Sequence, residues 1–216
     1  QREVALRDAA ERDRLTGLFS RSYLENRLES DVAMALRHGK PLALAMFAID
    51  NPQAIVAAHG QATLDQIHRE LARRVLEITR SDDLVARNGD EFVHVCRDVD
   101  AMRAARAALR VHATLADHNF AAASGPLRIT VSIGVADLAL LHEPTADALL
   151  KASESALVVA RRGGLQRGQG GGAARADLEV ERALAAEPRR LGGDPTGAGP
   201  GEVEVERELA AVPAVE

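Results

Sequence analysis

The sequence predicts an α/β protein, specifically an α+β sandwich in which helices flank a sheet with at least one β-hairpin. Segments with a helical spacing of apolar residues alternate with short β-rich runs along residues 1–162. Residues 41–49 (PLALAMFAI) form an uninterrupted apolar run, which is typical of a strand buried on both faces. Asn88-Gly89 separates two β-rich runs, and this dipeptide favours a two-residue hairpin turn.

The helical pattern is clearest over residues 63–78. Apolar residues there fall three and four positions apart and share one helix face, namely Leu64, Ile67, Leu71, Val75 and Ile78. A second helix is expected over 20–38, because Ser20 can act as its N-cap. Further helices are predicted over residues 4–14, 99–118 and 146–162.

The strands expected besides 41–49 are short and rich in β-branched residues. They are 84–86 (LVA), 92–96 (FVHVC) and 127–136 (LRITVSIGVA). The first two should pair through a type I′ turn centred on Asn88 and Gly89, because both residue types tolerate the positive φ that this turn requires.

Composition limits the class of protein. The chain has 216 residues, a formal net charge of −5 and 46% hydrophobic residues, enough for one core and a tail. No apolar run approaches the ~18 residues of a membrane span. The net charge is negative, whereas nucleic-acid-binding domains usually carry a basic patch. Cys96 is the only cysteine, which excludes an internal disulfide and fits a reducing, cytoplasmic location. We expect a segment of a longer protein, since it begins with Gln1 rather than Met.

The composition changes sharply after Arg162. Eleven of the 17 glycines lie from Gly163 onward, whereas all five aromatic residues precede it. Without aromatic or β-branched runs, this part cannot bury enough surface to offset the entropy of ordering. We therefore expect residues 165–216 to be a low-complexity, disordered tail, in which EVERALAAEP (179–188) and EVERELAAVP (204–213) repeat.

Five local patterns together resemble the GGDEF family, whose members make cyclic di-GMP from two GTP. DRLTGLFSRSYL (13–24) resembles the family's DxLTGLxNRRxF opening, and LLKASESALVVARRGG (149–164) its last helix. Between them lie PLALAMFAID, SDDLVARNGDEFVHV and ITVSIGVA in the family's order. The resemblance implies a nucleotide-cyclase palm-like domain over 13–164, with a central, mainly antiparallel sheet flanked by helices. Residues 1–12 would be a linker helix to an upstream sensor.

In the resembled family, a metal-binding Asp ends the first strand and nearby side chains hold phosphate and guanine. At the equivalent positions this chain has Ala48 for that Asp, Gln53 for a phosphate-binding Lys and Val56 for a guanine-reading Asn. Asp65 retains a second guanine-reading carboxylate. Asp50 lies two residues beyond Ala48 and could substitute for it only if the strand continued in register. The resemblance thus implies a degenerate site.

The hairpin also departs from the family pattern. The family has R-aromatic-G-G-D/E-E-F, whereas residues 87–92 read RNGDEF, one residue shorter. Asp90 and Glu91 remain as a candidate base and a candidate metal ligand, but the tightened turn and Asn88 should displace both carboxylates, and a displacement of ~1 Å already impairs catalysis. The open alternative is a plain hairpin with solvated acids.

The last helix has one further candidate. Arg161 stands where the family has a phosphate-binding Lys, and it could equally be a solvated residue in the last turn of the helix.

An RxxD motif precedes the hairpin at the offset of the family's inhibitory site, which binds cyclic di-GMP. Arg80 and Asp83 form this motif. An arginine can bond a guanine edge or a phosphate with two N–H groups, and an aspartate can accept from guanine. The other interpretation is a helix end followed by a turn. The arginine that the family adds from its long helix falls on Met34, with Arg37 about one turn away, so we include Arg37 as a third candidate.

The other chemistry-bearing residues form no recognisable site. Seven histidines show no metal-ligand spacing, so each is interpreted as a satisfied or surface residue. Cys96 in FVHVC is interpreted as a small core residue. We expect no resident cofactor, and Mg²⁺ at Asp50, Asp90 and Glu91 only if the domain is an active enzyme.

These observations favour a catalytically degenerate GGDEF domain that acts as a cyclic di-GMP receptor through Arg80, Asp83 and Arg37. In this interpretation Asp90, Glu91, Asp65 and Arg161 are vestiges of an active site. Two alternatives remain: an active diguanylate cyclase with product feedback, and a scaffold that binds no nucleotide. Expected partners are cyclic di-GMP, a second copy of the chain, and an upstream sensor or output protein, with no nucleic acid and no membrane.

Overall fold

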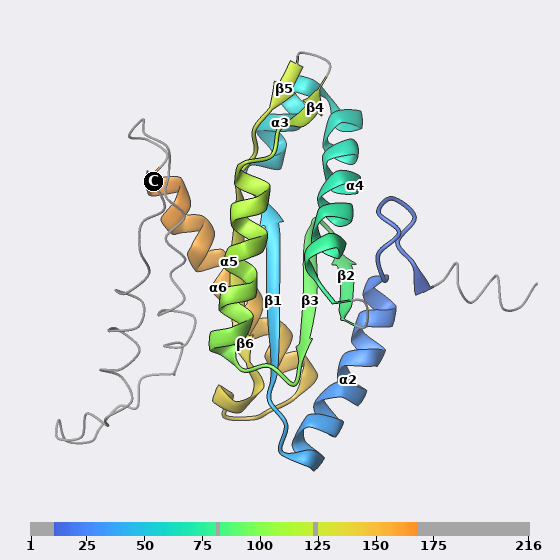
Figure 1. Cartoon of the computed structure of the whole chain (residues 1–216), viewed down its shortest axis with the longest axis vertical. Coiled ribbons are helices and arrows are strands. Elements are labelled where there is room, and N and C mark those ends of the chain that lie inside the picture. The colour runs from blue at the N-terminus through green and yellow to red at the C-terminus, as the bar shows by residue number, and fades with distance from the viewer. Residues whose placement is uncertain (1–10, 81–82, 123–124, 168–216) are drawn as a thin grey trace, which may run out of the picture. The chain divides into compact units, whose positions relative to one another are not determined.

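A computed structural model describes residues 11–80, 83–122 and 125–167, with side chains to 162 (Figure 1). Its centre is a four-stranded sheet in the order β2-β3-β1-β6, in which every neighbouring pair is antiparallel. The strands are β1 (Leu42–Ile49), β2 (Leu84–Asn88), β3 (Glu91–Arg97) and β6 (Val131–Asp137). The antiparallel sheet flanked by helices that the sequence predicts is therefore confirmed.

Helices cover both faces of this sheet. One face packs against α4 (Gln61–Ile78) and α5 (Ala101–Ala116), and the other against α2 (Arg21–His38) and α6 (Ala146–Arg167). In Figure 1, α4 and α5 stand in front of the sheet. As predicted, Ser20 caps α2, and its hydroxyl accepts from the backbone N–H of Tyr23.

Strand β1 contributes side chains to the core on both faces of the sheet. Alternate side chains of a strand point to opposite faces. Phe47 and Ile49 accordingly lie in the cluster under α4 and α5, while Met46 and Ala48 lie in the cluster under α2 and α6. All eight residues of β1 are buried, which confirms the expectation from the apolar run.

Four short elements were not predicted. They are α3 (Pro52–His59), β4 (Phe120–Ala122), β5 (Gly125–Leu127) and the 3₁₀ turn η1 (Leu138–Leu140). Helix α3 is eight residues long and has no fully buried residue, and its apolar residues 54–58 are consecutive, so its sequence shows no helical spacing, although Ile55 and Val56 pack against the core cluster. The predicted strand 127–136 is wrong in extent, because Leu127 ends β5 and β6 begins only at Val131.

The predicted helix over 4–14 is wrong at its C-terminal end. Arg12 forms an isolated bridge with Phe19, and residues 14–16 form a turn. The side chain of Asp13 accepts from the backbone N–H of Thr16 at 2.9 Å and from its hydroxyl at 2.6 Å, which closes this turn and competes with helix. The rest of the expected linker helix, residues 1–10, lies outside the described residues.

The hairpin turn is shifted by one residue from the prediction. Asn88 and Glu91 pair as the last residue of β2 and the first of β3, so Gly89 and Asp90 form the two-residue turn. Only Gly89 of these two has positive φ, at 67°. A glycine at the first central position is the pattern of a type II′ turn, not of the type I′ turn expected from Asn88-Gly89.

The C-terminal end of the domain depends on α6. This helix continues to Arg167, beyond the predicted helix end at Arg162. The predicted start of the tail at residue 165 is therefore wrong, because residues 165–167 are helical, and the rest of the expected tail, 168–216, lies outside the described residues. Within the described ranges, none of the helices has the length and apolarity needed to cross a membrane.

Candidate functional site

A cavity of about 440 Å³ lies where the end of β1 meets the β2–β3 hairpin. Antiparallel pairing brings the C-terminal end of β1 beside the N-terminal end of β3. The cavity therefore gathers three of the carboxylates that the sequence singled out, together with the cation from α6. Its lining is Ile49, Asp50, Asn51, Pro52, Gln53, Asp90, Glu91 and Arg161.

Ala48 is the second-to-last residue of β1, next to Ile49, which lines this cavity. It is fully buried, and it pairs with Glu91 of β3 on one side and with Ser132 of β6 on the other. Directly paired residues of antiparallel strands point to the same face. The methyl group of Ala48 thus lies between the side chains of Glu91 and Ser132, with no ligand atom in the middle strand.

Asp50 remains close to the sheet but has its own partner. Its Oδ1 accepts a hydrogen bond from the Ser132 hydroxyl at 2.7 Å, and its backbone N–H donates to the carbonyl of Thr130 at 2.9 Å. These contacts hold Asp50 toward β6. Asn51 follows with a positive φ of 49° and turns the chain into α3, so β1 does not continue in register through Pro52.

Glu91 and Arg161 approach each other across the cavity. The Arg161 Nη1 lies 3.8 Å from the Glu91 Oε1, and both side chains are partly exposed. Burial raises the pKa of Glu91; the charge of Arg161 opposes this shift, while Glu154 and Asp90 add to it. Arg161 therefore serves as a counterion to a half-buried acid, which a solvated last-turn residue would not do.

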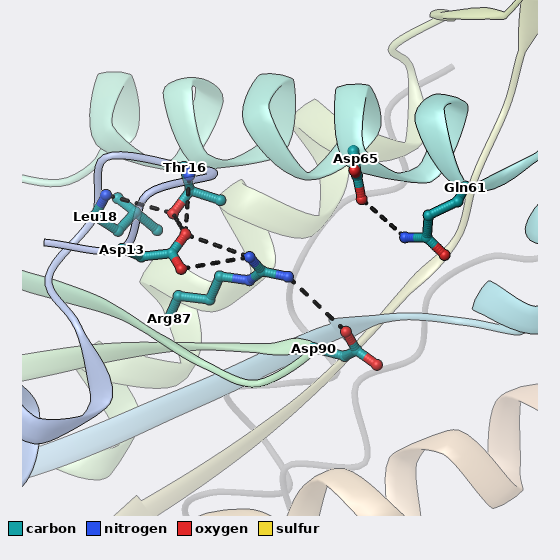
Figure 2. Close-up of polar contacts among 7 residues, drawn as sticks. All are labelled: Asp13, Thr16, Leu18, Gln61, Asp65, Arg87 and Asp90. Carbon is teal, nitrogen blue, oxygen red and sulfur yellow. Dashed lines mark hydrogen bonds and ion pairs between the residues drawn. The ribbon is translucent and has the colours of Figure 1, made fainter.

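Asp90 is linked to the N-terminal loop through Arg87 (Figure 2). Arg87 donates to Asp13 from Nη1, at 3.3 Å to Oδ1, and its Nη2 lies 3.9 Å from the Asp90 carboxylate. The Asp13 pKa is held below its usual range: burial raises it, but the hydrogen bonds from Thr16 and the charge of Arg87 outweigh that effect. Asp90 itself is mostly exposed at the turn.

A second cavity of about 400 Å³ lies beside the first, between α3, the start of α4 and the hairpin turn. Val56 and Gln53, which stand where the family reads guanine and holds phosphate, both line it. Asp65, which the resemblance predicts to be a guanine-reading carboxylate, accepts a hydrogen bond from Gln61 Nε2 at 2.8 Å (Figure 2). The Asp65 carboxylate thus already has a hydrogen-bond partner within α4.

The carboxylates do not form a magnesium site as they lie. Mg²⁺ requires several oxygen ligands in near-octahedral geometry. Asp50 is bonded to Ser132, Glu91 faces Arg161, and Asp90 faces Arg87. Among the described residues, no three His, Cys, Asp or Glu side chains lie close enough to hold a metal ion.

Arg80 and Asp83 lie in the turn between α4 and β2. The Asp83 N–H donates to the Arg80 carbonyl at 3.1 Å, and the Arg80 N–H donates to Asp83 Oδ2, also at 3.1 Å. The Arg80 side chain is exposed, and its guanidinium has no hydrogen bond or ion pair with a described residue. The two residues are therefore held together through the backbone of Arg80, which leaves its side chain available.

His94 of β3 is the partner of Asp83 that sequence reasoning missed. His94 Nε2 lies 2.9 Å from Asp83 Oδ2, and the histidine is 7% exposed. Burial lowers the pKa of His94, but the hydrogen bonds to Asp83 and Cys96 outweigh it and raise the pKa to about 9. Cys96 is buried, as predicted, and its sulfur lies 3.6 Å from His94 Nδ1. No motif marks His94, because its role depends on the pairing of β2 with β3.

Arg37 is not brought into this site by any described contact. It lies exposed in the last turn of α2, and no hydrogen bond or ion pair between described residues joins it to Arg80 or Asp83. Met34, at the family's arginine position, is 58% exposed on the same helix. The role of Arg37 stays a prediction.

His68 on α4 contradicts the interpretation of every histidine as satisfied or exposed. It is 1% exposed and packs beside the ring of Phe92, and neither ring nitrogen has a hydrogen-bond partner among the described residues. Burial and the charge of Arg87 lower its pKa, although Asp90, Asp65 and Asp13 act in the opposite sense. The imidazole is therefore held neutral.

We expect His68→Leu to raise the free energy of unfolding by about 1 kcal/mol at pH 7.5, because it removes a buried polar group without a partner among the described residues. The gain should grow below pH 6.5, since the unfolded histidine takes up a proton there that the folded one resists. Urea unfolding at pH 7.5 and pH 5.5 measures both. A variant that is less stable than the wild type, or a gain that is the same at both pH values, would contradict this account.

The fold and the acidic hairpin define a class. An antiparallel sheet that carries two adjacent acids at a β2–β3 turn, beside a cavity at the end of β1, is the arrangement of a nucleotide-cyclase palm-like domain. A family model described as "Diguanylate cyclase, GGDEF domain" matches residues 10–167. The chain belongs to the GGDEF domain family.

Known proteins agree with this assignment. The response regulator PleD of Caulobacter vibrioides is 34% identical over 155 residues, which cover 70% of this chain and 34% of PleD. Diguanylate cyclase DosC of Escherichia coli K12 is 30% identical over 157 residues, covering 72% of this chain and 34% of DosC. The chain thus spans about a third of the length of these relatives.

A solved structure gives the same result for the fold. The GGDEF domain of DgcB from Caulobacter crescentus, in complex with c-di-GMP, superimposes with a TM-score of 0.66 at 25% identity. The match covers 72% of this chain and 89% of the DgcB domain.

Proposed function

We propose that this chain is a catalytically degenerate GGDEF domain that binds cyclic di-GMP through Arg80 and Asp83 and regulates a sensor or output protein. The observation that carries the proposal is Ala48. Its buried methyl group lies between Glu91 and Ser132, where phosphoryl transfer would need an acid to anchor cations. A site without that acid favours a receptor over an enzyme.

The geometry of the RxxD turn supports binding. The exposed guanidinium of Arg80 can bond a guanine edge or a phosphate with two N–H groups and stack on a base. Asp83 uses Oδ2 for contacts within the protein, so Oδ1 can accept from the N1 and N2 groups of guanine. A relative of similar fold, the DgcB domain, was solved with c-di-GMP bound.

An active diguanylate cyclase is the second candidate, and one observation favours it. Asp50, Asp90 and Glu91 line a single cavity with Arg161, so the acids of a working site would need only local movement to converge. In that case Mg²⁺ would be the cofactor and the RxxD pair a feedback site. The contacts of Asp50 with Ser132 and of Glu91 with Arg161 are what such a movement would have to break.

Isothermal titration calorimetry with cyclic di-GMP tests the receptor role. We expect the wild type to bind and Arg80→Ala to bind at least about 10-fold more weakly, because a charged hydrogen-bonding group contributes roughly 1.5 to 3 kcal/mol. Arg110→Ala on α5 is a matched control, since it also removes an exposed arginine and should bind as the wild type does. Arg37→Ala measures whether the α2 residue takes part.

Incubation with GTP and Mg²⁺ separates the two candidates. The receptor proposal expects neither pyrophosphate nor cyclic di-GMP, whereas appearance of both products would establish the cyclase. Absence of heat with either cyclic di-GMP or GTP would reject both and leave a scaffold role.

A further inference from the structure

In the described part of the RxxD turn, one side-chain hydrogen bond joins the turn to the sheet, between Asp83 and His94. Residues 81–82 are not described, but two hydrogen bonds join the residues on either side of them. The Asp83 backbone N–H donates to the Arg80 carbonyl, and the Arg80 backbone N–H donates to Asp83 Oδ2. The only described side chain outside the turn that forms a hydrogen bond or ion pair with Asp83 is His94, on the neighbouring strand β3.

His94 occupies a place that packing alone would give to an apolar residue. It lies between Phe92 and Cys96 on the buried face of β3, and both neighbours belong to the core cluster under α4 and α5. A buried ion pair is seldom more stable than apolar residues of similar volume, because desolvation offsets the attraction. The pair is therefore better explained by the position it imposes on Asp83 than by a gain in stability.

The two carboxylate oxygens of Asp83 differ in their hydrogen-bond partners. Oδ2 receives hydrogen bonds from both His94 Nε2 and the Arg80 backbone N–H, while Oδ1 has no hydrogen bond or ion pair with a described residue. The Asp83 pKa lies below its usual value: burial raises it, but the hydrogen bond and charge of His94 outweigh that effect, so the carboxylate stays ionised.

We propose that His94 is a positioning residue for cyclic dinucleotide binding, which holds Asp83 Oδ2 so that Oδ1 faces the ligand beside the Arg80 guanidinium. This inference rests on the proposed receptor function and adds a residue outside the RxxD motif to it. His94 would not touch the ligand. It would affect ligand binding by orienting the Asp83 carboxylate, just as hydrogen-bond partners outside a metal site orient the residues that bind the metal.

Two substitutions separate the hydrogen bond from packing. His94→Leu keeps an apolar volume in the core but removes the donor, whereas His94→Gln places an N–H₂ group where Nε2 lies. We expect His94→Leu to weaken cyclic di-GMP binding about 10-fold and His94→Gln to restore most of it, by analogy with metal sites, where loss of a residue that orients a ligand costs about 10- to 100-fold in affinity. His68→Leu is the matched control, because it makes the same exchange at a buried position that packs beside Phe92 in the same core layer, and it should bind as the wild type does.

Calorimetry then gives distinct outcomes. If Arg80→Ala loses binding and His94→Leu binds as tightly as the wild type, the positioning role is overturned while the receptor function stands. If the wild type produces no heat with cyclic di-GMP, the receptor function fails and the inference falls with it. Binding lost in His94→Leu and recovered in His94→Gln supports both.

A spectroscopic measurement covers the case in which His94→Leu does not fold. The ring ¹⁵N resonances of His94 in the wild-type protein should shift when a saturating concentration of cyclic di-GMP is added, because Asp83 would then form hydrogen bonds with both the His94 ring and the ligand. Those of His68 should not. Unchanged His94 resonances in a protein that binds the ligand would overturn the proposal.

Discussion

Replacing Gly134 with alanine is expected to lower the free energy of unfolding by about 3 kcal/mol or more. Overpacking a core costs the most stability where the neighbouring atoms cannot move aside, which is the case here. A Cβ at this position would lie 2.2 Å from the backbone nitrogen of Leu157 and 2.6 Å from the carbonyl oxygen of Ser153. Both atoms belong to the backbone of α6, so no side-chain rotation relieves the clash. Strand β6 would have to move away from the helix that covers it.

Gly39→Ala provides the control for this prediction. Gly39 ends α2 with a φ of 61°, and a Cβ there would have open space around it. Its substitution should cost only the ~1 kcal/mol of a left-handed backbone. Urea unfolding of the two variants compares a steric cost with a conformational one. Equal losses would show that α6 can shift and that the close approach at Gly134 is not required.

Ala48→Asp is expected to destabilise the protein by about 3 to 5 kcal/mol at pH 7, because it places an unpaired carboxylate in a buried layer. Glu91 is the paired residue on the same face, and burial already raises its pKa. A second acid beside it adds repulsion between like charges. Both carboxyl groups would then have raised pKa values in the folded state, and stability would be regained as the pH falls toward them.

Ala48→Asn separates charge from volume in this experiment. Asn has nearly the shape of Asp without its charge, so its loss of stability should be smaller at pH 7, and the difference between the two variants should shrink at pH 5. Thermal unfolding with and without Mg²⁺ adds a second measurement. We expect Mg²⁺ to raise the melting temperature of Ala48→Asp and to leave the wild type unchanged. A wild type stabilised by Mg²⁺ would argue against a degenerate site.

Most of the fold follows from patterns within single segments. The run 41–49, the apolar spacing of 63–78 and the Ser20 cap all specify their elements locally, and the structure confirms each of them. The errors occur where local signals are weak or compete. Helix α3 buries no residue, Asp13 closes a turn where a helix was expected, and the turn at Gly89 uses Asp90 where Asn88 was expected.

The candidate site was only partly predictable. The sequence shows that Ala48 has no ligand atom and that Arg80 and Asp83 have the RxxD spacing on which the proposed binding site depends. Sequence patterns did not reveal which acids already have partners. Asp50 pairs with Ser132 across 82 positions, and Arg87 with Asp13 across 74, so neither contact leaves a mark in any one segment.

The sequence by itself determined the order of the main helices and strands, the membership of the family and the absence of a ligand atom at Ala48, because each of these depends on residue types and near spacing. Only the tertiary structure decided that Ala48 lies between Glu91 and Ser132, and that His94 holds Asp83. The physical reason is that strand register sets which distant side chains share a face, and a hydrogen bond between them forms only within about 3 Å.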